Sequence, residues 1–154
     1  MGNVLFYHLT RQPLEVTLPM LLGKALGAGW RVVVRGPHKA RLQMLDSVLW
    51  TRDPNDFMPH GLAGGAFDVD QPVLLTSGDD MPNGARCLMT VDGGQVSVDE
   101  VQRLERVCIL FDGNDEAAVG HARGQWKSLT DAGCSAQYWS QERGKWEKKA
   151  ESSG

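Results

Sequence analysis

The sequence of 154 residues predicts a single α/β domain with three layers and a largely parallel sheet. Short β-prone runs alternate with helical patterns along the chain, and several of these runs are apolar throughout, as strands buried on both faces are. A chain of this length buries roughly 70% of its unfolded surface, enough for a core without disulfides or metals. We expect residues 1–140 to form this domain and the polar residues 141–154 to form a partly disordered C-terminal tail.

The first three predicted elements are a strand, a helix and a strand. Residues 4–9 are β-prone, and residues 31–35 form a β-branched run bounded by charges. Between them, Thr17 can cap a helix that has Pro19 in its first turn and Gly27 and Gly29 as its stop signals. The apolar positions of that helix recur with a helical period: Leu18, Leu21, Leu22, Ala25 and Leu26. A strand, a helix and a second strand in this order predict a parallel crossover.

The second predicted helix opens at residues 36–37, Gly-Pro, and ends near Trp50. Its buried stripe consists of Leu42, Leu45 and Leu49. The helix runs into a loop that carries two large aromatic residues, Trp50 and Phe57, and then into a flexible Gly-rich link at residues 61–65. A loop normally buries such rings or uses them for binding.

The second half of the chain continues the alternation. Strands are predicted at residues 72–76, 86–91, 107–111 and 135–139. Ser97 and Glu100 have the spacing of a capping box, which predicts a short helix at that point. A longer helix is predicted from about Asn114 to Ala132, with Gly133 as its stop signal.

Charge and cysteine usage narrow the function classes. A net charge of −3 and a pI of about 5.8 argue against direct nucleic-acid binding, which needs a basic surface. The three cysteines, Cys87, Cys108 and Cys134, lie in apolar runs without a CxxC spacing, which predicts buried, reduced thiols. The chain shows no membrane-spanning run and no secretory leader, so we expect a soluble, cytoplasmic protein.

Motifs for catalysis, metals or cofactors are not found. Residues 23–24, Gly-Lys, resemble the end of a phosphate-binding loop, but Leu18 and Ala25 stand where a glycine and a hydroxyl are required. The apolar run that ends in Asp112 resembles a magnesium-binding strand, although a core strand and a turn explain it more simply. A degenerate nucleotide-binding or nucleotide-hydrolysing domain that uses Asp112 and Lys24 remains the alternative function.

One face of the last predicted long helix carries Arg123, Trp126 and Lys127 at positions i, i+3 and i+4. A ring beside a cation suits the carboxyl end of a peptide, because the ring desolvates an apolar side chain while arginine pairs with the charge. The alternative is a core tryptophan with two solvated cations, which spacing alone favours.

A helix-ending leucine-tryptophan, a phenylalanine seven residues later and a Pro-His-x-Leu-Ala-Gly run follow one another at Leu49, Trp50, Phe57 and residues 59–64. With the preceding strands, this pattern resembles the chi subunit of bacterial DNA polymerase III holoenzyme. The resemblance covers the first half of the chain well and returns in the last long helix at Arg123, Trp126 and Lys127.

The resemblance implies a domain that is similar to nucleotide-binding folds but lacks the phosphate loop, and that has no catalytic activity of its own. It implies a monomer within a hetero-complex, with two partners: the psi subunit of the clamp-loader complex and the acidic, Phe-ending C-terminal tail of single-stranded DNA-binding protein. Direct contact with nucleic acid or membrane is not expected.

The residues that the resemblance assigns to the tail-binding pocket are Trp50, Phe57, Phe111, Arg123, Trp126 and Lys127. In this assignment Arg123 pairs with the terminal carboxylate of the tail, and the rings hold its phenylalanine. Lys127 is the cation that can replace a basic residue expected where Val119 stands. The sequence does not locate the psi-binding surface.

Overall fold

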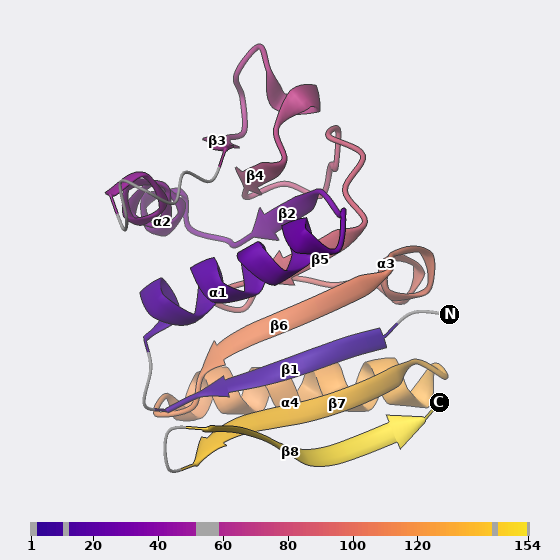
Figure 1. The fold of residues 1–154 in the computed structure, drawn as a ribbon. Helices are drawn as coiled ribbons and strands as arrows, with labels where there is room; N and C mark the ends of the chain where they lie inside the picture. Colours follow the sequence, from indigo (N-terminus) through magenta and orange to yellow (C-terminus); the bar gives the residue numbers. More distant parts are fainter. Residues whose placement is uncertain (1–2, 11–12, 52–58, 143–144, 154) are drawn as a thin grey trace.

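One eight-stranded sheet, in the order β3-β4-β2-β5-β6-β1-β7-β8, organises the computed structural model (Figure 1). The structure describes residues 3–10, 13–51, 59–142 and 145–153. The strands are β1 Asn3–Leu9, β2 Val32–Arg35, β3 His60–Leu62, β4 Val73–Thr76, β5 Cys87–Thr90, β6 Arg106–Asp112, β7 Ser135–Glu142 and β8 Lys145–Ser153. The helices are α1 Leu14–Gly27, α2 Lys39–Thr51, α3 Val98–Arg103 and α4 Glu116–Asp131, with a 3₁₀ turn η1 at Asp68–Asp70.

The sheet is largely parallel and has helices on both faces, which confirms the predicted fold class. Every strand pair is parallel except β7 with β8. Alternation along β2 shows the two faces: Val32 and Val34 pack in the core that includes α1 and α2, whereas Val33 packs in the core that includes α3 and α4. All three cysteines are free and buried, as the sequence predicted.

Helix α1 begins earlier than the sequence predicted. It starts at Leu14 after Pro13, so Thr17 is a buried residue inside the helix rather than its cap, and Pro19 also lies inside it. The reason is burial: Leu14 is part of the same core as Leu18, and ordering one more turn places its side chain there. The predicted end at Gly27 is correct.

The predicted flexible link after the second helix contains a strand. Residues 60–62 form β3 and pair with β4. His60 anchors this strand, because its imidazole is buried and lies 3.1 Å from a carboxylate oxygen of Asp46 on α2. Helix α2 itself extends through Trp50, with the predicted Leu42, Leu45 and Leu49 stripe buried.

The last strand runs to Glu142, and β8 follows it as an antiparallel partner that the sequence analysis did not predict. Most of the expected polar tail, Lys145–Ser153, lies in this strand. Trp146 packs edge-on against Tyr7, with ring centroids 5.3 Å apart, so one aromatic contact attaches a largely charged strand to the core. No helix in the described ranges is long and apolar enough to cross a membrane.

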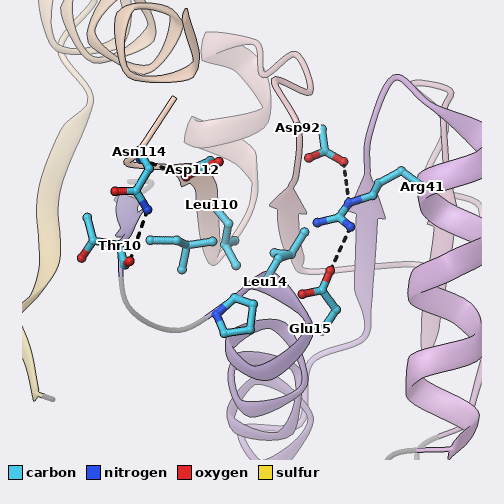
Figure 2. Close-up of a pocket in the computed structure, with 10 residues that line it drawn as sticks. Thr10, Leu14, Glu15, Arg41, Asp92, Leu110, Asp112 and Asn114 are labelled. Atoms are coloured by element: carbon cyan, nitrogen blue, oxygen red, sulfur yellow. Dashed lines mark hydrogen bonds and ion pairs between the residues drawn. The ribbon is translucent and has the colours of Figure 1, made fainter. Parts of the chain in front are cut away.

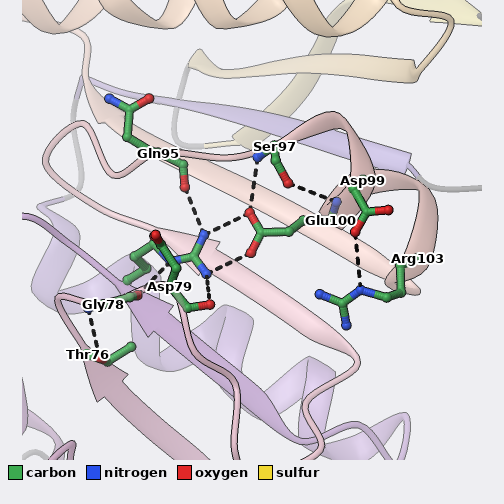
Figure 3. A network of polar contacts seen from close by, with 9 residues as sticks. Thr76, Gly78, Asp79, Gln95, Ser97, Asp99, Glu100 and Arg103 are labelled. Atoms are coloured by element: carbon green, nitrogen blue, oxygen red, sulfur yellow. Dashed lines mark hydrogen bonds and ion pairs between the residues drawn. The ribbon is translucent and has the colours of Figure 1, made fainter.

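A buried arginine at the carboxyl end of β2 joins three segments (Figure 3). The side chain of Arg35 is 4% exposed and forms a bidentate pair with Glu100 on α3, at 2.7 and 2.9 Å. Its remaining N–H groups donate to the carbonyl oxygens of Gly78, Asp79 and Gln95.

Glu100 also completes the predicted capping box with Ser97. Burial alone would raise the pKa of Glu100, but the hydrogen bonds from Arg35 and Ser97 outweigh it and hold this pKa below its ordinary value.

The Glu100→Gln substitution should lower the free energy of unfolding by about 3 kcal/mol at pH 7, because it leaves the Arg35 charge buried without its partner. Urea denaturation measures the loss. The control is Asp99→Asn, which removes an exposed partner of Arg103 at 3.7 Å and should cost less than about 0.5 kcal/mol.

The same pair predicts a pH dependence. Because the folded pKa of Glu100 lies below its unfolded value, its stabilisation is complete above the unfolded pKa, roughly 4.3, and is lost as pH falls through the folded pKa. The difference between the wild type and Glu100→Gln should therefore shrink below about pH 4. Equal stability of the two proteins at pH 7 would contradict this role for the pair.

Candidate functional site

An aromatic cluster lies on the α4 side of the sheet, over three neighbouring strands. Its members are Phe6 and His8 of β1, Phe111 of β6, Tyr138 of β7 and Trp126 of α4. Parallel registry places Phe6 opposite Tyr138 and His8 opposite Phe111, so these side chains point to the same face in adjacent strands. We call this group the aromatic cluster.

Trp126 connects α4 to the cluster. Its ring lies 5.3 Å from the Phe6 ring and 6.2 Å from the Tyr138 ring, in tilted and edge-on arrangements typical of aromatic pairs. The side chain is half-buried, packed against the core on one side and exposed on the other. Trp126 therefore packs in the core and is also partly exposed, although its spacing in the sequence presented these as alternatives.

A polar contact runs through the middle of the cluster. The Tyr138 hydroxyl lies 2.8 Å from Nδ1 of His8, whose ring stacks on Phe111 at 5.2 Å. Burial raises the pKa of Tyr138, whereas the charge of Arg123 acts in the opposite direction. The phenol is therefore protonated at neutral pH, and it shares a hydrogen bond with Nδ1 of His8.

Arg123 differs from Lys127 on this surface in having no ion-pair partner among the described residues. It is exposed on α4, its charge reaches Tyr138, and it makes no hydrogen bond or ion pair with any residue that the structure describes. Lys127 differs, because its ammonium lies 3.1 Å from the carboxylate of Asp131 one turn later. Only Arg123 of the two therefore has its full hydrogen-bonding capacity available to a ligand.

Trp50 lies elsewhere. It lies in the last turn of α2 at the β3 edge of the sheet, is 51% exposed, and has its ring 4.4 Å from the ring of His60. Helix α2 packs on the core that includes α1, whereas α4 packs over β6 and β7 on the other face. The structure thus brings Phe111, Arg123 and Trp126 into one region and does not bring Trp50 to them. Phe57 lies outside the described residues.

Three members of the cluster, Phe6, His8 and Tyr138, were not singled out from the sequence as site residues. The available signal was strand alternation, since His8 follows Phe6 by two residues in a predicted strand. Recognising Tyr138 as their neighbour requires the pairing of β1 with β7, which joins residues far apart in the chain.

A cavity of about 320 Å³ lies at the carboxyl ends of β1 and β6, where a nucleotide would be expected (Figure 2). The crossovers from these strands leave in opposite directions there, through α1 and α4. Arg41 is the one cation among its described lining residues, and it is paired with Glu15 at 2.8 Å and Asp92 at 3.2 Å. Asp112 adds further negative charge, so this cavity disfavours a phosphate.

Lys24 lies too far from this cavity to contribute to a phosphate site. It lies near the carboxyl end of α1, 10 residues beyond Leu14, which places it about 15 Å along the helix axis from the end where Asp112 lies. The nucleotide-binding alternative therefore finds no support in the geometry.

A larger cavity of about 600 Å³ flanks α4 on its other side. Phe111 and Ala122 belong to its apolar lining, but Asp92, Asp112 and Asp115 line it as well. Arg41 also lines this cavity, but it is paired with Glu15 and Asp92. The three carboxylates therefore disfavour an acidic ligand, and the Arg123 flank of the helix is the better site for one.

Comparison with known proteins identifies the family. The family model described as DNA polymerase III chi subunit, HolC, matches residues 1–137. The chain belongs to this family. A curated relative, DNA polymerase III subunit chi of Haemophilus influenzae, is 37% identical over 49 residues. That match covers 32% of this chain and spans only about a third, 34%, of the relative's length.

The role of Trp126 in the fold can be measured. We expect Trp126→Ala to lower the free energy of unfolding by about 2–3 kcal/mol, somewhat less than truncation of a fully buried tryptophan, since the ring is half-buried. Lys127→Ala, one residue away and exposed, should change it by less than about 0.5 kcal/mol. Thermal or urea denaturation compares the two. If both variants were as stable as the wild type, Trp126 would not belong to the core.

Proposed function

We propose that the chain is a non-catalytic accessory subunit that joins the clamp loader, through psi, to the acidic C-terminal tail of single-stranded DNA-binding protein. The observation that carries this proposal is Arg123, an exposed guanidinium without a partner among the described residues, on the same face as the half-buried rings of Trp126 and Tyr138. On this proposal the chain works in the cytoplasm and reaches DNA only through its partners.

The chemistry of the surface suits the end of such a tail. A guanidinium presents a planar fork of N–H groups to a carboxylate, and the pair is strengthened where neighbouring rings exclude water. Trp126 and Tyr138 are the rings on this side, and they offer faces and edges to a terminal phenylalanine. We therefore assign the terminal carboxylate to Arg123 and the phenylalanine ring to the surface of the aromatic cluster.

Charge sets the expected strength of binding. The chain carries a net charge of −3 and the tail is acidic, so long-range attraction is weak and binding depends on local contacts. Lys127, shared with Asp131, adds little to a carboxylate contact. A micromolar affinity that weakens as salt is added fits this arrangement.

A bridging subunit needs a second surface, and the β3 edge of the sheet offers one. Trp50 is 51% exposed there, and Leu62 of β3 is 36% exposed. Because Trp50 is remote from Arg123, we assign it to the contact with psi rather than to the tail pocket. The tail and psi can then bind at the same time.

The tail contact is tested with a peptide that copies the acidic, Phe-ending terminus of single-stranded DNA-binding protein. We expect Arg123→Ala to weaken binding at least tenfold, the loss of a charge-assisted hydrogen bond. Lys127→Ala is the matched control on the same helix and should weaken it less than about threefold, since that ammonium is already paired. Fluorescence anisotropy or calorimetry gives both affinities. Unchanged affinity in Arg123→Ala would remove this assignment, as would equal binding of a peptide that lacks the terminal phenylalanine.

The second surface is tested by Trp50→Ala. We expect this variant to lose capture of psi by at least tenfold, as removal of an exposed aromatic anchor typically does, and to keep the wild-type affinity for the tail peptide. Pull-down with psi and peptide titration are measured on the same preparation, after the melting temperature shows that the variant is folded. If Trp50→Ala instead kept its binding to psi and lost its affinity for the peptide, Trp50 would belong to the tail pocket.

A further inference from the structure

A cavity of about 320 Å³ lies between α1 and the sheet, on the face opposite to α4. Leu21 and Ala25 of α1 line one side, while Trp139 of β7 and Trp146 of β8 line the other. The family model ends at residue 137, so both tryptophans belong to the part of the chain beyond the matched range. The tail contact and the psi contact proposed above use neither of them.

The body of this cavity is apolar. Leu5, Met20 and Met89 complete its walls with the residues just named. Cys108 lines it too, and a hydrogen bond with Cys87, together with burial, raises the pKa of Cys108 well above its ordinary value, so this thiol is uncharged at neutral pH. A volume near the lower end of the range for ligand pockets suits a small apolar molecule.

Two hydrogen-bond donors that line this cavity have no acceptor among the described residues, and one of them is buried. The side chain of Tyr7 is 9% exposed and lines the cavity, yet its hydroxyl has no partner among the residues that the structure describes. The indole Nε1–H of Trp146 is the buried one, and it also lacks an acceptor in the described part of the chain. The two ring centroids lie 5.3 Å apart, so both side chains line the same part of the cavity. A buried donor without an acceptor, as the indole N–H of Trp146 is, is unusual and indicates a missing polar group.

The charged residues that line the cavity are positive. Lys24 and Arg106 line it, and none of its described lining residues is an aspartate or a glutamate. Arg106 is held with its guanidinium carbon 5.2 Å from the centre of the Trp30 ring. Burial raises the pKa of Tyr7, and the charge of Arg106 opposes this, so the guanidinium lies near the hydroxyl. Glu151 of β8, which contacts the lining residue Gln137, is paired with Lys148 at 3.0 Å.

We propose that this cavity binds a small apolar carboxylate, such as a medium-chain fatty acid or an arylalkanoate. The apolar body of the ligand lies between α1 and the tryptophans. Its carboxylate accepts hydrogen bonds from the hydroxyl of Tyr7 and the indole N–H of Trp146, and it is attracted by Arg106 and Lys24. This assignment is independent of the proposed function, because it uses the opposite face of the sheet.

Titration with octanoate tests the proposal, with octylammonium as the probe of equal chain length and opposite charge. The chain has five tryptophans, whose indole N–H signals are resolved by ¹H–¹⁵N NMR and assigned by single Trp→Phe variants. Octanoate should shift the Trp146 signal in a saturable manner and leave those of Trp50 and Trp126 unchanged. Octylammonium should not shift the Trp146 signal.

Two variants separate binding from folding. Tyr7→Phe keeps the ring and removes the unpartnered hydroxyl, so it should weaken octanoate binding about tenfold, the effect of losing one hydrogen bond to a charged group, without lowering the melting temperature. Arg106→Gln should weaken it as well, whereas Arg103→Gln, on the opposite side of the sheet and paired with Asp99, should not.

The proposal is overturned by any of three results: no saturable shift of the Trp146 signal, equal responses to octanoate and octylammonium, or unchanged octanoate affinity in Tyr7→Phe. A markedly lower melting temperature of Tyr7→Phe would also overturn it, since the hydroxyl would then have a structural partner.

Discussion

The buried charge of Arg35 is the constraint on which this fold most depends. Its five N–H groups meet five acceptors, two on Glu100 and three on the carbonyls of Gly78, Asp79 and Gln95. Loss of any of these partners would leave a buried guanidinium unsatisfied and destabilise the folded state. The two loops and α3 must therefore take the positions that supply all five acceptors. One side chain at the end of β2 thereby determines how the chain passes from β4 to β5 and on to α3.

That passage positions the strands from which the aromatic cluster is built. Helix α3 contacts β1 and β6, and it shares their core with α4. The register of β6, β1 and β7 then brings Phe111, His8 and Tyr138 to the same face. A slip of one residue in β1 would turn His8 and Phe6 to the α1 side, because successive side chains of a strand alternate between faces. The candidate site therefore depends on sheet register more than on local conformation.

The elements that could be predicted are those that depend on residues close together in the chain. Apolar periodicity located most strands and helices, and the Ser97–Glu100 spacing identified a capping box that the structure contains. Elements that depend on distant partners were missed: β3 is three residues long and is held by the buried His60, and β8 is a largely charged strand attached through Trp146.

The candidate site shows the same division. Arg123 and Trp126 lie on one helix, and their spacing alone indicated a shared face. Trp50 has the same local character as Trp126, an aromatic residue at the surface of a helix, so local pattern could not assign it to the opposite edge of the sheet. Strand order decides that placement, and strand order is a property of pairing between residues that are distant in the chain.

The distance between Trp50 and the aromatic cluster bears on the proposal that this chain joins two partners. Strands β4, β2 and β5 separate β3, beside Trp50, from β6, beneath α4. Four strand spacings amount to about 19 Å, and the two helices lie on opposite faces of the sheet. Partners at Trp50 and Arg123 need not compete for space. Joining them therefore requires no conformational change in this chain, only a rigid sheet, and the buried Arg35–Glu100 pair contributes to that rigidity at its centre.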